Sequence, residues 1–345
     1  MSSRRHTDLG RPAIADRERL LQAVAGFRAS RIILSAFELG IFSALGDRRL
    51  EAGRVARLTG IDPRAGERLL NALCALGLVR KAGGRYANSG ISRRYLVAGR
   101  PGYLAGLSHS ASQWQSWSTL SAAVRRGTAV RQRPAASGGE ARRRGFIAAM
   151  HDRASRQAPV IVARLDLKNV KRGLDIGAGS GAYAMALARA GKNMRVTAFD
   201  LPEVLPITRE YVRREGFTRR IDFRPGDFRR GGFGRGYDLV MLSAVVHMND
   251  GPQNRRLIAR AAAALALGGQ LVVQDFIMDA GRTRPALGAL FALNMLVATA
   301  GGDSYTAAEI ASWMRGAGLK DIRRIPTPFP ASLLVGRKPG AACGG

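Results

Sequence analysis

A glycine-rich segment at residues 174–181 has the composition of a ligand-binding turn. Its sequence, LDIGAGSG, follows a stretch typical of a strand and precedes one typical of a helix. Gly177, Gly179 and Gly181 allow the backbone to turn tightly and to approach a ligand closely. Asp200 ends the next predicted strand, 19 residues after Gly181, where a carboxylate can accept both hydroxyls of a ribose. These residues predict a nucleoside-containing cofactor, with a turn that binds nothing as the alternative.

The glycines alone do not distinguish a dinucleotide from S-adenosylmethionine, because Gly177, Gly179 and Ala182 also satisfy the GxGxxG/A pattern. Asp175 favours S-adenosylmethionine, since a carboxylate beside the first glycine suits the ammonium of a methionine moiety and would repel a pyrophosphate. A second Gly-Asp pair, followed by Phe228, comes after the third predicted strand and offers a hydrogen bond and a ring edge to adenine. The predicted cofactor is therefore S-adenosylmethionine.

His247 is the candidate general base for methyl transfer. Displacement at a sulfonium is in-line, so the protein must hold nucleophile and methyl group together and remove the proton of a hydroxyl nucleophile. His247 lies just past the fourth predicted strand, at the edge where open parallel sheets bind ligands. A structural or substrate-contacting histidine is the alternative at this position.

The pKa difference between base and nucleophile restricts the methyl acceptor. The unperturbed pKa is about 6.5 for histidine and about 10 for a phenol, with tyrosine as the model. Full proton transfer between them costs about 5 kcal/mol, which a nearby sulfonium lowers. An aliphatic alcohol, close to water at about 15.7, would cost far more. We therefore expect a phenolic or enolic hydroxyl on a small aromatic or secondary metabolite, with C-methylation of an activated aromatic carbon as the alternative.

Aromatic, sulfur-containing and polar side chains supply candidates for a substrate pocket. Phe291, Asn294 and Met295 fall at i, i+3 and i+4 and so share one face of a predicted helix. Asn294 is the better candidate there, because a polar group among apolar neighbours needs a partner. The predicted substrate contacts are Trp117, Met150, Phe291, Asn294 and Met295. Packing in a hydrophobic core is the alternative for each.

From residue 171 onward strands alternate with helices, which predicts an α/β domain with a parallel, Rossmann-like sheet. The last two strands are joined by a turn too short for a parallel crossover, so the final strand must run antiparallel, and this also favours S-adenosylmethionine. Thr306 and Glu309 predict a capping box on the last helix. Strands are predicted at 172–176, 195–199, 221–225, 237–243, 269–276, 320–326 and 332–337, and helices at 181–190, 203–215, 252–266, 287–299 and 307–316.

The first hundred residues have the element order of a winged helix-turn-helix. Helical patterns at 20–45, 51–58 and 63–76 precede a hairpin around Gly83-Gly84. Asp62 and Pro63 mark the start of the third helix. The predicted organisation is a polar tail at 1–19, a winged-helix-like domain at 20–100, a helical connector at 101–165 with a loop at 127–145, a cofactor-binding domain at 166–339 and a second tail at 340–345.

With these motifs, the chain resembles the class I S-adenosylmethionine-dependent O-methyltransferases of the plant caffeate and bacterial polyketide or carotenoid type. The likeness covers residues 20–338, with motifs at 174–181, 199–202, 226–228, 268–273, 294–296 and 301–306. It implies an N-terminal winged-helix-like domain that mediates homodimerisation and binds no DNA. It also implies that His247 is the base and that Asp275 orients it. The cofactor-binding residues that it implies are Asp175, Gly177, Gly179, Gly181, Asp200, Leu201, Asp227, Phe228 and Ser243.

Three residues depart from the plant pattern. Asn249 stands where the plant enzymes carry Trp, Asp275 is one methylene shorter than their Glu, and Ser304 stands where a second Glu follows the paired glycines. These departures bear on the acid–base assignment more than on the cofactor. Transfer driven by proximity, or a member that binds the cofactor without methylating, are therefore alternatives.

The net charge of +30 raises a competing hypothesis, a nucleic-acid binder or RNA methyltransferase. The basic excess is spread along the whole chain and is mostly Arg, and no aromatic-plus-basic cluster indicates a base-stacking platform. We therefore predict no specific nucleic-acid partner. The only cysteines, Cys74 and Cys343, exclude a disulfide scaffold and predict a reducing, cytoplasmic compartment. Neither a secretory signal, nor a membrane-spanning segment, nor a metal site is predicted.

Overall fold

The computed structural model describes residues 14–130 and 139–340. Within them, contacts divide the chain after Trp114 into two compact units. The first unit holds α1 Arg17–Ala25, α2 Phe27–Glu38, α3 Ile41–Leu45, β1 Leu50–Glu51, α4 Ala52–Thr59, α5 Pro63–Ala75, β2 Val79–Ala82, β3 Arg85–Asn88 and α6 Gly90–Tyr95. Helix α7, Leu107–Trp117, ends just past the division.

The predicted hairpin and the start of the third helix are confirmed in this first unit. β2 and β3 pair antiparallel around Gly83 and Gly84, whose φ angles of 54° and 74° are left-handed. β1 adds to β3, which gives a three-stranded sheet in the order β1-β3-β2. Asp62 caps α5 by accepting a hydrogen bond from the Ala65 N–H, and Pro63 is the first helical residue. The element order is that of the winged-helix-like domain.

Two predictions about the beginning of the chain were wrong. The pattern at 20–45 predicted one helix, but the chain turns at Gly40, which has a φ of 70° and separates α2 from α3. The polar tail was predicted to reach residue 19, but α1 begins at Arg17 because Asp16 caps it through the Arg19 N–H at 2.8 Å. Residues 1–13 of that tail lie outside the described part of the chain.

Helices α1 and α2 carry an apolar stretch that is largely exposed. By length and composition alone, Arg17–Glu38 is a helix that could cross a membrane, the one such helix among the described residues. Gly26 keeps right-handed helical backbone, so α1 and α2 follow each other without a turn. Only 6% of the most apolar stretch is buried. Most of the apolar stretch in Arg17–Glu38 is therefore not covered by the rest of the first unit.

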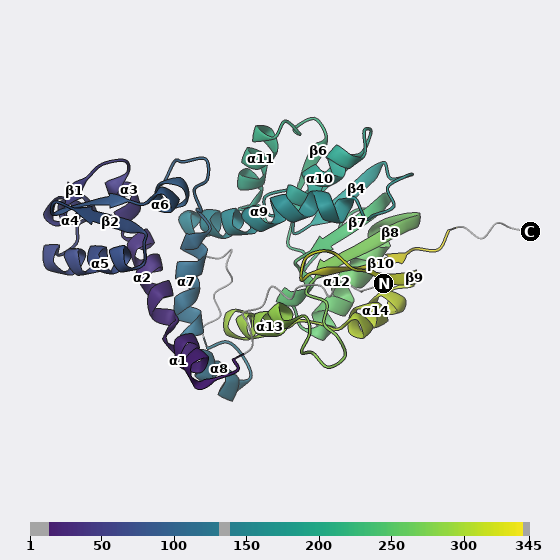
Figure 1. Cartoon of the computed structure of the whole chain (residues 1–345). Coiled ribbons are helices and arrows are strands. Elements are labelled where there is room, and N and C mark those ends of the chain that lie inside the picture. Colours follow the sequence, from purple (N-terminus) through teal and green to yellow (C-terminus); the bar gives the residue numbers. More distant parts are fainter. Residues whose placement is uncertain (1–13, 131–138, 341–345) are drawn as a thin grey trace, which may run out of the picture. The chain divides into compact units, whose positions relative to one another are not determined.

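The second unit contains a seven-stranded sheet between two layers of helices (Figure 1). Its strands are β4 Arg172–Ile176, β5 Arg195–Asp200, β6 Ile221–Pro225, β7 Tyr237–Ser243, β8 Leu265–Asp275, β9 Lys320–Ile325 and β10 Ser332–Arg337. Its helices are α8 Leu120–Arg126, α9 Glu140–Val162, α10 Ala182–Ala190, α11 Leu205–Arg214, α12 Gly251–Ala264, α13 Ala286–Ala298 and α14 Ala307–Gly316, and η2 Val246–Met248 is a short 3₁₀ turn.

The sheet order is β6-β5-β4-β7-β8-β10-β9. β4, β5, β6, β7 and β8 pair in parallel, whereas β10 lies antiparallel between β8 and β9, as predicted. β7 shows why the centre is buried on both sides. Leu239 and Met241 join the apolar cluster beneath α9 and α10, and Val240 and Leu242 join the cluster beneath α12 and α14. This alternation fixes the register, and the parallel pairing of β4 to β8 brings their carboxyl ends to one edge.

The predicted loop at 127–145 is shorter in the structure. Gly127 ends α8 with a φ of 72°, but α9 already begins at Glu140, so the Arg142–Arg144 run is helical. Arg144 explains the early start, because it pairs with Glu140 one turn back and makes a two-pronged ion pair with Glu210 of α11. Glycine, proline and serine were predicted to extend the loop through this segment. Residues 131–138 lie outside the described chain.

Candidate functional site

The glycine-rich turn follows β4 directly and opens α10. Gly177, Gly179 and Gly181 have φ angles of 75°, 55° and 76°, a region that side chains rarely adopt. A Cβ on Gly177 would lie 2.8 Å from the Val245 side chain, so only glycine fits there. The Gly179 N–H donates to the Asp200 carboxylate at 2.7 Å, and the Thr208 hydroxyl donates to the Gly179 carbonyl at 2.7 Å. The turn is thus held in a fixed shape by groups from β5 and α11.

Asp175 and Asp200 are carboxylates whose ionisation is costly in this fold. Asp175 is 1% exposed and accepts the Ala184 N–H at 3.0 Å, and burial raises its pKa to about 7. Asp200 also accepts the Leu201 N–H at 2.7 Å, and burial raises its pKa to about 6. Burial favours the neutral acid in both cases, whereas a cation bound nearby would favour the carboxylate.

The other predicted cofactor motif lies against the same turn. The Gly226 N–H donates to the Asp200 carbonyl at 2.9 Å, which joins the end of β6 to the end of β5. Asp227 accepts the N–H of Arg229 at 2.8 Å. The ring of Phe228 lies about 4 Å from where a Cβ on Gly177 would be. The ring edge expected for adenine therefore lies beside Gly177, where the missing Cβ leaves room for the Val245 side chain.

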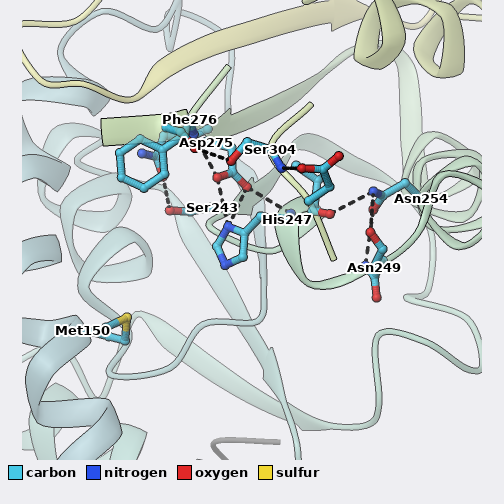
Figure 2. Close-up of polar contacts among 12 residues, drawn as sticks. Met150, Ser243, His247, Asn249, Asn254, Asp275, Phe276 and Ser304 are labelled. Atoms are coloured by element: carbon cyan, nitrogen blue, oxygen red, sulfur yellow. Dashed lines mark hydrogen bonds and ion pairs between the residues drawn. The ribbon is translucent and has the colours of Figure 1, made fainter. Parts of the chain in front are cut away.

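His247 and Asp275 form a buried pair, as Figure 2 shows. Nδ1 of His247 lies 2.9 and 3.0 Å from the two carboxylate oxygens of Asp275, and the backbone N–H of His247 donates to the same carboxylate at 3.3 Å. The Phe276 N–H donates to it at 2.9 Å. The His247 side chain is 10% exposed, and among the described residues Nε2 has no hydrogen-bond partner. Nδ1 is occupied, so Nε2 is the nitrogen that can take a proton.

Aromatic rings and a strained turn complete the surroundings of His247. Phe291 of α13 packs edge-to-face on the His247 ring at 4.7 Å, and Phe276 packs on Phe291 at 4.9 Å. Ala244, between β7 and η2, has a left-handed φ of 55° and donates its N–H to the Gln274 carbonyl. The chain therefore turns sharply after β7, and this turn aims His247 at the end of β8.

Two of the departures from the plant pattern have structural roles away from the His247 ring. Asn249 is buried, donates its amide to Asn254 at 3.3 Å, and its carbonyl accepts the Tyr305 hydroxyl at 2.5 Å. Ser304 is also buried and donates its hydroxyl to the Gly288 carbonyl at 2.9 Å. Ser304 is thus bonded to backbone rather than to His247, and the contact to Nδ1 comes from both oxygens of Asp275.

The predicted substrate residues fall into two groups. The Trp117 indole N–H donates to the Asn294 side-chain oxygen at 3.0 Å, so two residues predicted independently lie together. Phe291 contacts His247 from the same helix, where Met295 is buried. Met150 is on α9 and contacts the Arg153 guanidinium at 3.6 Å. In Figure 2 Met150 stands apart from the His247 hydrogen-bond network.

Sequence reasoning missed the polar partners that brace this edge of the sheet, Gln274 and Tyr183 among them. Ser243, predicted as a cofactor contact, donates its hydroxyl to the Gln274 side chain at 2.6 Å, and the Tyr183 hydroxyl bonds to Ser243. Burial raises the pKa of Tyr183 to about 12, so this hydroxyl is protonated at neutral pH. His151 of α9 contacts Ser180 in the glycine-rich turn. No local pattern marks these residues, because their partners come from distant elements.

With this geometry, comparison with known proteins is informative. Residues 117–320 match the model of an O-methyltransferase domain, and residues 21–98 match that of an O-methyltransferase dimerisation domain. The chain belongs to the O-methyltransferase family. It is 32% identical to 3-hydroxy-5-methyl-1-naphthoate 3-O-methyltransferase of Streptomyces sahachiroi, with 92% of this chain and 94% of that protein covered. It is 34% identical to the tetracenomycin polyketide synthesis 8-O-methyl transferase TcmO of Streptomyces glaucescens, with 93% and 96% covered.

A solved structure, PigF with SAH, superposes with a TM-score of 0.85 at 26% identity and covers 94% of this chain and all of that one. The chain of 345 residues described here is thus an S-adenosylmethionine-dependent O-methyltransferase. It has the α/β fold and the N-terminal helical domain that its sequence predicted. The winged-helix order belongs to a dimerisation domain, so the nucleic-acid hypothesis is not favoured. The residues at the turn fit the cofactor, because Asp175 and Asp200 are buried carboxyls whose ionisation a bound cation would favour, and the Gly179 N–H fixes Asp200 on the turn.

Proposed function

We propose that this methyltransferase methylates a phenolic or enolic hydroxyl of a small aromatic metabolite, with His247 as general base. The observation that carries the proposal is the His247–Asp275 pair at the end of β7 and β8. Two relatives that the chain covers almost completely are named for O-methylation of a naphthoate and of a polyketide. The aromatic rings of Phe276 and Phe291 beside His247 suit a flat, apolar acceptor.

The proton path follows from the hydrogen bonds. Asp275 holds Nδ1–H, which leaves the lone pair on Nε2 to accept the acceptor's hydroxyl proton. Once its proton has moved to Nε2, the acceptor oxygen would be free to take up a methyl group from a cofactor bound at the glycine-rich turn. Asp275 stabilises the imidazolium that results, because its negative charge is fixed 2.9 Å away. S-adenosylmethionine supplies the activated methyl group, and Asp175, Asp200, Asp227 and Phe228 would hold it.

Replacement of the base tests the proposal directly. His247→Ala should lower kcat at least tenfold, because general bases contribute about 10²- to 10⁴-fold. The dissociation constant for S-adenosylhomocysteine, measured by calorimetry, should change less than twofold. The acceptors to screen with labelled S-adenosylmethionine are phenols, naphthoates, flavonoids and pigment precursors. An unchanged kcat would remove the base role, and product methylated on carbon would favour the C-methylation alternative.

We also propose that the enzyme is a homodimer that forms through the first unit. Residues 21–98 match a dimerisation domain. Within it, Leu21, Val24 and Phe27 are 50%, 65% and 52% exposed, an apolar face that a second copy would cover. Phe27→Asp should shift sedimentation from dimer to monomer, whereas Leu267→Asp, at an apolar position of the second unit that is 64% exposed, should not. A stable wild-type monomer would refute the proposal. A cytoplasmic location remains a prediction, which cell fractionation tests.

A further inference from the structure

His151 lies on α9, apart from His247, and its partner belongs to the glycine-rich turn. Nδ1 of His151 is 2.9 Å from the Ser180 hydroxyl oxygen. Ser180 is 3% exposed and stands between Gly179 and Gly181, both of which have left-handed backbone. A distant helix thus contacts the centre of the turn through a side-chain hydrogen bond.

The turn needs such anchors because of its composition. Glycines have little conformational preference of their own, so a turn with three of them is ordered by its neighbours. Asp200 and Thr208 hold the backbone of Gly179 from β5 and α11. His151 is the partner of the Ser180 side chain, the next residue along. Together the three contacts hold the turn from three different elements.

The His151 ring is itself held in place. Its centroid is 4.2 Å from that of Tyr211 on α11. Burial, and then the nearby Arg214, lower the pKa of His151, whereas Glu215 and Asp152 act in the opposite direction. The ring is therefore neutral at neutral pH, and either tautomer can form the bond to Ser180. Neither the proton transfer to His247 nor the acceptor contacts involve this ring.

We propose that His151 is a positioning residue for the cofactor turn, so that its hydrogen bond to Ser180 strengthens cofactor binding without contributing to methyl transfer. The inference rests on the assignment of the turn as the cofactor site, and is independent of the role of His247. It assigns His151 neither to catalysis nor to the acceptor pocket. The expected signature is a change in cofactor affinity with kcat preserved at saturating cofactor.

Three single variants separate the hydrogen bond from the ring. His151→Phe keeps the ring on Tyr211 but loses the bond, His151→Asn places a polar atom where Nδ1 lies, and Ser180→Ala removes the partner. His151→Phe and Ser180→Ala should each raise the dissociation constant for S-adenosylhomocysteine about 3- to 10-fold, the range of one hydrogen bond. His151→Asn should stay within about twofold, as a rescue by the shorter polar side chain.

The double variant decides whether the two residues act through one contact. His151→Phe/Ser180→Ala should bind S-adenosylhomocysteine no more weakly than the poorer single variant. Multiplied effects, an Asn variant as weak as the Phe variant, or a fall in kcat at saturating S-adenosylmethionine would overturn the proposal. Wild-type enzyme that fails to bind S-adenosylhomocysteine would instead overturn the cofactor assignment. If His151→Phe does not fold, Ser180→Ala alone must still show the loss of affinity.

Discussion

Asp175→Asn should stabilise the fold at neutral and alkaline pH. The pKa of Asp175 is raised by burial, next to a smaller lowering by the Ala184 N–H, from 3.8 to about 7. A raised carboxyl pKa means that the folded state binds a proton more tightly than the unfolded chain does. Stability is therefore greatest at low pH and falls as the pH rises from about 4 to about 7. An amide in place of the carboxyl removes this loss.

The magnitude follows from the two pKa values. The shift from 3.8 to about 7 means that ionised Asp175 lowers the free energy of unfolding by about 4 kcal/mol at pH 8, where the carboxyl is ionised in both the folded and the unfolded state. At pH 5 the corresponding cost is about 2 kcal/mol, because the folded state remains protonated there. How well Asn packs beside the Ala184 N–H changes the stability of the variant equally at both pH values. The difference between pH 8 and pH 5, about 2–3 kcal/mol in favour of the variant, therefore tests the burial argument alone.

Urea unfolding of both proteins at pH 5, 6, 7 and 8 measures this difference. Asp321→Asn, which removes an exposed carboxylate at the start of β9, is the matched control for a lost negative charge. Asp175→Asn should also bind S-adenosylhomocysteine more weakly than wild type at pH 8. The carboxylate charge of Asp175, which burial disfavours, is the charge that would attract the ligand's ammonium. A free energy of unfolding with the same pH dependence in wild type and Asp175→Asn would refute the reasoning.

Three further predictions concern the catalytic edge and the acceptor. Asp275→Asn should lower kcat about 10- to 100-fold, because an amide donor at Nδ1 puts the proton of His247 on Nε2. The affinity for S-adenosylhomocysteine should stay within about twofold, and a pH profile of kcat like that of wild type would contradict this prediction. Ala244→Gly should raise the free energy of unfolding by about 1 kcal/mol and Ala244→Val should lower it by about 2 kcal/mol, since the φ of 55° is strained for any side chain. Chemical unfolding measures both changes. A destabilised Gly variant would show that the left-handed backbone is not strained. Trp117→Phe should raise KM for the acceptor about 3- to 10-fold by releasing Asn294, with KM for S-adenosylmethionine as the internal control; equal changes in both would argue against an acceptor role.

The sequence predicted the features that neighbouring residues determine. The capping box at Thr306 and Glu309 is present with both of its hydrogen bonds, because its groups are three residues apart. The antiparallel final strand followed from the short connection before it, which permits no crossover. The placement of His247 at the end of β7 followed from the direction of parallel strands. Each of these depends on local chain geometry.

Contacts between distant segments were not predictable in the same way. Trp117 and Asn294 are 177 residues apart, and each was predicted as a substrate residue without any sign that they pair. The contact from His151 to Ser180 depends on how α9 packs on α10. Ser304 stands where the plant enzymes carry a Glu, and only the structure shows that its hydroxyl bonds to the Gly288 carbonyl. Such partners are chosen by packing in three dimensions, which a single sequence does not record.

The charge distribution at the sheet edge also separates the two cofactors that the glycine pattern allowed. Four carboxylates stand at the ends of β4, β5, β6 and β8, and each accepts at least one backbone N–H in a chain whose net charge is +30: Asp175, Asp200, Asp227 and Asp275. A carboxylate can accept about four hydrogen bonds, so these groups are fixed in place and still able to bind a ligand. A pyrophosphate at this edge would add negative charge beside Asp175 and Asp200, whose ionisation burial already disfavours. A ligand that carries a sulfonium and an ammonium would instead favour ionisation of both acids. Binding a cation would thus offset the cost of burying the two carboxyl groups, and we propose that these anchored acids, rather than the abundant surface arginines, favour S-adenosylmethionine.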